Sequence, residues 1–201
     1  CITVNQSIAE IFKKKYKTQF QVVRNISETQ AILNYKSKSE LNLPANKKLI
    51  LMQGAGINMD RGAEELIEAM AFVQDALLLI IGSGDVWEIL KKKVIEKGLT
   101  EKVRLISKIP KSELMEYTHQ ADVVLSIDKN TNLNYYYSLP NKIFDYIQAE
   151  IPILASRLPE IENILNGYEI GEFIENHEPK HIAEKLNALL ISPHLRSYKK
   201  N

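Results

Sequence analysis

Residues 77–81 form the apolar run Leu77-Leu78-Leu79-Ile80-Ile81, which leads directly into Gly82-Ser83-Gly84-Asp85. A continuous apolar run closed by a glycine turn is typical of a parallel strand buried on both faces, because a strand with one exposed face would alternate apolar and polar residues. Parallel strands are joined by crossover connections, which are usually helices. The run therefore predicts an α/β fold, with strands and helices alternating on either side of it.

The chain on both sides of this run keeps the expected alternation. Strands are predicted at 48–52, 76–81, 103–106, 123–126, 152–155 and 171–174, from short apolar segments. Helices are predicted between and after them, at 61–72, 87–97, 111–120, 141–148, 159–165 and 179–190. This order predicts a doubly wound, Rossmann-like parallel sheet of six strands.

The segments outside the alternating region differ in character. Residues 7–16 have helical spacing and residues 20–23 resemble a short strand, so 1–25 is interpreted as a helix-strand remnant of a preceding domain. Residues 26–47 are polar, contain Pro44, and are interpreted as a linker. The predicted divisions are therefore 1–25, 26–47, an α/β domain at 48–191, and a polar, basic tail at 192–201.

Composition narrows the functional classes. A length of 201 residues fits one domain with an appendage. The 26 basic and 25 acidic residues nearly cancel, which argues against the broad basic surface of a nucleic-acid-binding protein. With Cys1 as the single cysteine and no Cys/His cluster, we expect no disulfide, no metal site and a reducing, cytoplasmic setting. The sequence has no initiator Met, so we expect it to begin within a longer protein, and no run reaches the roughly 20 apolar residues of a membrane span.

Ligands of open α/β sheets lie beyond the carboxyl ends of the strands, so the loops there are the candidate sites. The first loop contains Gly54, Gly56 and Arg61, where free backbone amides and a guanidinium group favour a phosphate. The alternative is a glycine turn with a solvated arginine. The second loop contains Gly82 and Gly84, and its spacing alone favours a tight turn over ligand contact.

The third candidate segment ends at a predicted helix start. Pro140 and Asn141 open the helix, and Lys142 and Asp145 lie one turn apart on the same face. Lys142 would meet a phosphate, while Asp145 would accept hydrogen bonds from a ribose diol. The alternative is a surface ion pair between these two residues.

The order of these motifs resembles the C-terminal domain of GT-B fold glycosyltransferases, in particular the large retaining E-x7-E family (group 1, family 4). The resemblance covers about residues 48–190. The matching segments are the glycine loop before Arg61-Gly62, the turn Ile81-Gly82-Ser83-Gly84, the stretch 103–110, the triplet Ala121-Asp122-Val123, the helix start Pro140-x-Lys142-x-Phe144-Asp145, and the strand 151–156.

The resemblance implies roles for individual residues. Arg61 and Lys142 would bind the donor diphosphate, Asp145 the ribose hydroxyls, and the loop at 108–110 would flank the base. The first motif glutamate falls on Tyr137, which has no carboxylate, so the retaining or inverting outcome and the catalytic residue stay open. The substrate-binding residues are predicted to be Gly54, Gly56, Arg61, Gly82, Gly84, Lys108, Ile109, Tyr137, Ser138, Leu139, Pro140, Lys142 and Asp145.

The activity implied by the resemblance is transfer of a hexosyl group from a nucleoside diphosphate sugar to a glycan or lipid-linked acceptor, without metal or cofactor. Bacterial surface polysaccharide or glycolipid assembly is the expected setting. The start of the chain resembles the last elements of the family's N-terminal domain, so we expect most of the acceptor domain to be missing. The chain alone would then bind donor weakly and transfer nothing, and membrane contact at the inner face would come through the missing domain.

Two alternatives remain at this point. A sugar-nucleotide 2-epimerase shares the architecture, and a non-catalytic nucleotide-binding or regulatory α/β domain would share the fold without the reaction. The four histidines, His119, His177, His181 and His194, are scattered and are predicted to be solvated surface residues.

Overall fold

The computed structural model describes residues 1–26, 35–166 and 170–192. Within these ranges the main sheet has six strands, all parallel, in the order β5-β4-β3-β6-β7-β8. The strands are β3 (Lys48–Gly54), β4 (Ala76–Gly82), β5 (Val103–Ser107), β6 (Val123–Ser126), β7 (Ile153–Ser156) and β8 (Gly171–Ile174). This is the Rossmann order, and it confirms the predicted doubly wound sheet.

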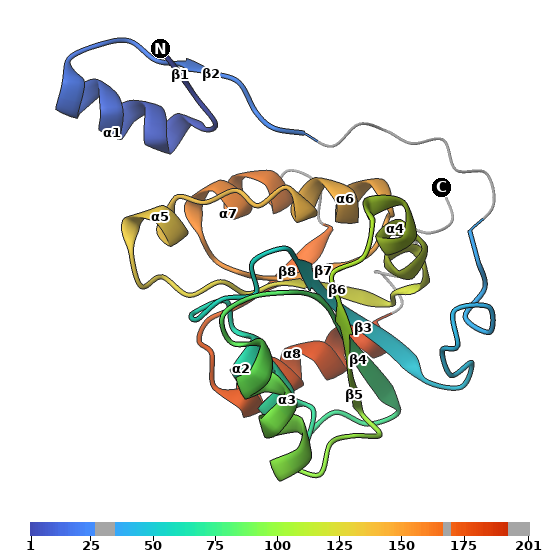
Figure 1. The fold of residues 1–201 in the computed structure, drawn as a ribbon. Coiled ribbons are helices and arrows are strands. Elements are labelled where there is room, and N and C mark those ends of the chain that lie inside the picture. Colours follow the sequence, from blue (N-terminus) through green and yellow to red (C-terminus); the bar gives the residue numbers. More distant parts are fainter. Residues whose placement is uncertain (27–34, 167–169, 193–201) are drawn as a thin grey trace.

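Helices cover both faces of the sheet (Figure 1). One face carries α2 (Ala63–Ala69), α3 (Trp87–Glu96) and α8 (Pro179–Ile191). The other carries α4 (Lys111–Gln120), α6 (Lys142–Gln148) and α7 (Pro159–Leu165). A single-turn helix, α5 (Leu133–Tyr136), lies in the connection between β6 and α6 and was not expected from the sequence.

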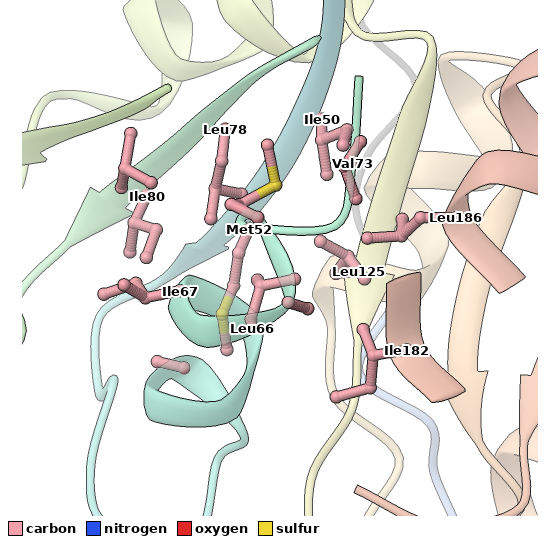
Figure 2. Close-up of a cluster of buried hydrophobic side chains, with 14 of the residues drawn as sticks. Ile50, Met52, Leu66, Ile67, Val73, Leu78, Ile80, Leu125, Ile182 and Leu186 are labelled. Atoms are coloured by element: carbon pink, nitrogen blue, oxygen red, sulfur yellow. The ribbon is translucent and has the colours of Figure 1, made fainter. Parts of the chain in front are cut away.

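The apolar strands are buried from both sides. In β3, Ile50 and Met52 belong to the core under α2, α3 and α8, whereas Leu49 and Leu51 belong to the core on the opposite face. None of the four is more than 2% exposed. Figure 2 shows the first of these cores, where the strands meet Leu66 and the helix residues beside it. Burial on both faces explains why these strands read as continuous apolar runs.

The N-terminal segment forms its own small unit. β1 (Ile2–Thr3) pairs in parallel with β2 (Gln21–Val22), and α1 (Gln6–Tyr16) connects them. Asn5 begins α1, where its Oδ1 accepts from the Ile8 amide, and its Nδ2 donates to the Tyr137 carbonyl at 2.7 Å. The buried Glu160 of α7 accepts from the Ser7 amide at 3.0 Å. These contacts tie the segment to the end of the domain that holds α5 and α7.

The described part of the expected linker packs against the domain. Leu41 and Leu43 are buried in the core that α4, α6 and α7 cover. Lys38 and Lys48 both form ion pairs with Asp122, whose carboxylate also accepts from the Leu49 amide. Burial by itself raises the pKa of Asp122, but these hydrogen bonds and charges bring the pKa below the ordinary aspartate value. Residues 35–47 therefore form part of the folded domain surface.

Helix α2 starts later than the sequence suggested. Gly62 has a φ of 78° and sits outside the helix as its N-cap, so Arg61 precedes the helix instead of beginning it. The expected helix at 61–72 was therefore wrong at its first two residues, because a residue in the left-handed region cannot continue a helix. It was also too long at its other end, because α2 ends at Ala69. Strand β3 extends to Gly54, so this glycine ends a strand.

The described histidines are not simply solvated, which corrects the prediction for them. His119 stacks on Tyr35, with ring centroids 3.4 Å apart. His177 Nε2 lies 2.9 Å from the Ile127 carbonyl oxygen, and His181 Nε2 accepts from the Glu175 amide at 3.0 Å. His194 lies outside the described residues.

The described ranges hold neither a metal-binding cluster of side chains nor a helix suited to span a membrane. No group of three or more His, Cys, Asp or Glu side chains there is arranged to hold a metal ion. No helix among residues 1–26, 35–166 and 170–192 has the length and apolar character to cross a membrane.

Candidate functional site

A pocket of about 810 Å³ opens beyond the carboxyl ends of the central strands. It lies where the strand order reverses between β3 and β6, which is the usual ligand position in an open α/β sheet. Its lining is Asn25, Ile26, Met52, Gln53, Gly54, Ala55, Gly56, Ile57, Arg61, Ile81, Gly82, Lys108, Ile109, Lys111, Leu114, Pro140, Asn141, Lys142 and Asp145.

Two glycines pack the loops after β3 and β4 against each other. Gly82 is the register partner of Gly54, and a Cβ on Gly82 would overlap the Gly54 carbonyl oxygen. A Cβ on Gly84 would overlap the Ile57 carbonyl oxygen in the same way. The Ile57 amide donates to the Ser83 carbonyl at 2.7 Å, which joins the two loops. A Cβ on Gly54 or Gly56 would meet only ordinary van der Waals contacts, at 3.5 Å or more, and both glycines line the pocket.

Arg61 enters the pocket from the loop between β3 and α2. Its Nη1 lies 2.9 Å from Oδ2 of Asp128, a carboxylate with no exposed surface. Its guanidinium carbon lies 4.2 Å from the centre of the Tyr135 ring. The Arg61 Nε is buried and makes no hydrogen bond within the described chain. The guanidinium is thus held on two sides, and its buried Nε–H retains hydrogen-bonding capacity.

Lys142 reaches the same pocket from the opposite loop, as the first residue of α6. Burial lowers the pKa of the Lys142 ammonium below its ordinary value. The Asp128 carboxylate counteracts this decrease in the pKa, and the positive charge of Arg61 adds to it. A second anion in the pocket would therefore favour the charged form of Lys142.

Asp145 lies one helical turn beyond Lys142 and is buried, with 8% of its surface exposed. The alternative interpretation, an ion pair between Lys142 and Asp145, is wrong. Asp145 pairs with Lys111 instead, with Oδ1 3.3 Å from the Lys111 Nζ. That oxygen makes no hydrogen bond within the described residues. Asp145 is therefore a buried acceptor at the pocket wall with hydrogen-bonding capacity left.

The structure brings nine of the thirteen predicted residues to this one pocket. They are Gly54, Gly56, Arg61, Gly82, Lys108, Ile109, Pro140, Lys142 and Asp145. That any of them binds a ligand stays a prediction.

The other four predicted residues do not line the pocket. Gly84 packs under Ile57, and the Tyr137 ring lies edge-on against Tyr136 with centroids 4.7 Å apart. Ser138 Oγ donates to the Tyr135 carbonyl at 2.9 Å, and Leu139 packs on the core of the α6 face. Three of these residues sit in the short turn around α5, whose local packing directs their side chains away from the cavity.

Asp128 and Lys111 are not among the residues predicted from the sequence. Asp128 comes two residues after β6, at a strand end, which is the one signal in the sequence that points to it. No glycine or proline stands beside it to mark a ligand-binding loop. Lys111 begins α4 and reaches Asp145 only through the fold. No spacing in the sequence indicates that contact.

The fold and its pocket define a Rossmann-like α/β domain of the GT-B kind. The chain belongs to the group 1 glycosyl transferases, whose family model matches residues 34–201. This membership confirms the resemblance in the motifs, and it supports neither the 2-epimerase nor the non-catalytic alternative.

Solved glycosyltransferases share the fold at low sequence identity. WaaG, described as a glycosyltransferase involved in lipopolysaccharide biosynthesis, is 18% identical with a TM-score of 0.78, over 97% of this chain and 54% of its own. Sucrose-phosphate synthase from Thermosynechococcus elongatus is 21% identical with a TM-score of 0.80, over 99% and 51%. Anabaena HepE, solved with UDP and glucose, is 14% identical with a TM-score of 0.78, over 96% and 54%. The chain thus spans about half the length of these proteins. No curated protein matches the sequence at a significant level.

Proposed function

We propose that the pocket binds the nucleoside diphosphate part of a sugar donor and that the protein transfers the hexosyl group to a glycan or lipid-linked acceptor. The observation that carries this proposal is the convergence of Arg61 and Lys142 on one pocket from two different loops, with Asp145 one turn further on. Membership of the group 1 glycosyl transferases supports it. So does the similar fold of HepE, which was solved with UDP-glucose.

The charges around the pocket suit a diphosphate. Four cationic side chains line it, and they are opposed by Asp145 in the lining and by the buried Asp128 behind Arg61. The four are Arg61, Lys108, Lys111 and Lys142. The excess is positive, so it would stabilise a diphosphate leaving group as negative charge develops on it. We propose on this basis that the reaction needs no divalent metal.

The remaining parts of a donor also have matching groups. Arg61 Nε is a buried donor without a partner in the described chain, and a phosphate oxygen would supply one. The free capacity of Asp145 Oδ1 matches a ribose hydroxyl, which donates a hydrogen bond. Ile109 and Leu114 provide apolar surface at the pocket edge, where a base would stack.

A complete transferase would need more than this pocket. The solved proteins of similar fold are about twice as long, so we propose that a second domain binds the acceptor and closes over the donor. Residues 1–25 would then belong to that domain, 26–47 to the connection, and 48–191 to the donor domain, on whose surface the described part of the connection, 35–47, packs. The chain alone would bind donor weakly and transfer no sugar. A cytoplasmic enzyme of bacterial polysaccharide or glycolipid assembly, contacting the inner membrane face through its acceptor domain, fits these features.

Calorimetric titration of the chain with UDP, GDP and ADP tests the proposal. We expect at least one nucleotide to bind with a dissociation constant between about 10 μM and 1 mM, corresponding to roughly 4 to 7 kcal/mol. EDTA should leave this affinity unchanged. Arg61→Ala should weaken binding at least tenfold, since hydrogen bonds to charged groups contribute about 1.5–3 kcal/mol.

A matched control is Arg157→Ala. Arg157 also pairs with a carboxylate, at 2.7 Å from Glu162 Oε1, and stacks on an aromatic ring, that of Phe173, but it does not line the pocket. Its replacement should leave nucleotide affinity unchanged. If none of the three nucleotides binds at millimolar concentration, the proposal is wrong for this chain.

A further inference from the structure

The loops after β3 and β6 run side by side over a short distance. The Lys129 amide donates to the Asp60 carbonyl at 2.8 Å, and the Tyr135 hydroxyl lies 3.4 Å from the Met59 carbonyl oxygen. The Lys129 side chain adds an ion pair with Glu65 at 2.6 Å. The stretch that precedes α2 is thus joined to the stretch that follows β6, through backbone and side-chain contacts.

Gly62 makes this close approach sterically possible. Its φ is 78°, and a Cβ built on it would lie 2.5 Å from the Ile127 carbonyl oxygen. Any other residue would push the two loops apart. The neighbours of this contact are Arg61 on one loop and Asp128 on the other, so the glycine lets the guanidinium reach the carboxylate.

Asp128 is an unusual residue at this position. Its carboxylate has no exposed surface, and neither oxygen makes a hydrogen bond within the described chain. The Arg61 guanidinium, 2.9 Å from Oδ2, is therefore its main compensation. A buried carboxylate with so few partners costs stability, because its desolvation is only partly offset. A functional role for Asp128 therefore explains its presence better than a contribution to stability does.

We propose that Asp128 is a positioning residue that fixes the Arg61 guanidinium, together with the ring of Tyr135, so that it faces the donor diphosphate. This inference rests on the proposed function. Asp128 itself is fully buried and lines no part of the pocket, so it acts through Arg61 and touches no substrate. An arginine held on two faces loses less conformational entropy when an anion binds, which raises its affinity for that anion.

A second observation agrees with this role. The Asp128 charge acts on Lys142 and counteracts the decrease in its pKa that burial causes. The charged groups that act on Lys142 are Asp128 from the loop after β6 and Arg61 from the loop after β3. One carboxylate therefore acts on two of the four cations of the pocket: it orients Arg61 and favours the charged form of Lys142.

Positioning and simple charge predict opposite results for Asp128→Asn. Removing a negative charge near a phosphate site should tighten anion binding if charge alone matters. Freeing Arg61 from its anchor should weaken binding if position matters. We expect about a tenfold loss of UDP affinity at pH 7, corresponding to loss of one preorganised contact. Removing the Asp128 charge also lowers the pKa of Lys142 further. As pH rises, the variant should therefore lose UDP affinity at a lower pH than the wild type does.

The experiment is a calorimetric double-mutant cycle in the full chain, with UDP as the ligand. Asp128→Asn should cost about tenfold in the wild-type background and clearly less in the Arg61→Ala background, because the positioning effect passes through Arg61 and only the effect on Lys142 remains. Asp122→Asn is the matched control: it removes a paired aspartate from the other end of β6, outside the pocket, and should leave UDP affinity unchanged.

A second pair of variants keeps the test valid if Asp128→Asn does not fold. Tyr135→Phe retains the ring under the guanidinium and should bind UDP within about twofold of the wild type, whereas Tyr135→Leu should bind about threefold more weakly. Equal or tighter UDP binding by Asp128→Asn, an equal loss in both backgrounds, or equal affinities of the two Tyr135 variants would overturn the inference. Failure of the wild type to bind any nucleotide would instead refute the proposed function, and this inference with it.

Discussion

The loop after β3 and the loop after β6 both supply charge to the pocket, but they hold their shapes by different means. The first depends on backbone packing, since Gly82 touches Gly54 and Gly62 touches Ile127 so closely that no side chain fits. The second, which includes α5, depends on side chains such as Asp128 and Tyr135, and on the bond from Asn5 to the Tyr137 carbonyl. A close backbone contact requires glycine, which can be recognised in the sequence, whereas a buried contact between side chains has no such sequence signal.

The largest effect is expected from a change in the backbone packing of the first loop. Gly82→Ala should destabilise the protein by more than about 4 kcal/mol or prevent folding, because the added methyl overlaps the Gly54 carbonyl oxygen. The control is Gly98→Ala, where φ is also positive, 64°, but nothing lies within 4 Å of the added carbon. It should cost only about 1 kcal/mol. Urea unfolding measures both, and similar losses would contradict the role of close packing.

The next effect concerns the cation that the second loop supplies. Lys142→Ala should lower UDP affinity about tenfold at pH 7, from loss of one charged contact. The lowered pKa of Lys142 also sets a direction for pH: wild-type affinity should decrease as pH rises through that pKa, at a pH below the ordinary lysine value of about 10.4. The variant should lack this dependence. An identical alkaline decrease in both proteins would assign it to another group.

A smaller effect is expected where the N-terminal segment meets the second loop. Asn5→Ala removes both the cap of α1 and the hydrogen bond to the Tyr137 carbonyl. We expect a loss of about 1–2 kcal/mol in the free energy of unfolding, typical of a buried cap. Gln6→Ala, an exposed neighbour whose bond to Glu10 lies on the surface, should cost less than about 0.5 kcal/mol. Equal costs would mean that the segment is not anchored through Asn5.

The smallest effect tests a residue that the sequence assigned to the site. Ser138→Ala should leave UDP affinity within about twofold, because the Ser138 hydroxyl donates to the Tyr135 carbonyl instead of facing the pocket. Its cost in stability should be about 0.5–1.5 kcal/mol, the contribution of one hydrogen bond. A tenfold loss of UDP affinity in calorimetry would restore Ser138 as a ligand-binding residue.

Apolar runs and glycine turns in the sequence were enough to predict the sheet, its helices and part of the pocket. The run 77–81 and its neighbours are buried on both faces, so the sheet and its helices follow from apolar periodicity. Gly54, Arg61 and Lys142 stand at strand or helix ends that this pattern locates, and all three reach the pocket. The errors concern details that depend on distant contacts. Arg61 lies before its helix because Gly62 adopts a positive φ where it packs against the Ile127 carbonyl. Tyr137 does not line the pocket because it caps the end of α5.

The missed residues share one physical cause. Asp128 pairs with Arg61, 67 positions earlier, and Lys111 pairs with Asp145, 34 positions later. Only the folding of the chain into the parallel sheet brings these partners together. Neither the spacing nor the residue type in the sequence marks such a pair.

We propose above all that UDP or a related nucleotide binds in the pocket between the loops after β3 and β6. Backbone amide chemical shifts of the labelled chain, recorded during titration with the nucleotide that binds best, test it most directly. We expect the amide shifts of Gly54, Gly56, Arg61, Ile109 and Lys142 to change, and those of α1 and α3 to stay the same. Shifts confined to other surfaces, or no shifts at millimolar nucleotide, would contradict this proposal.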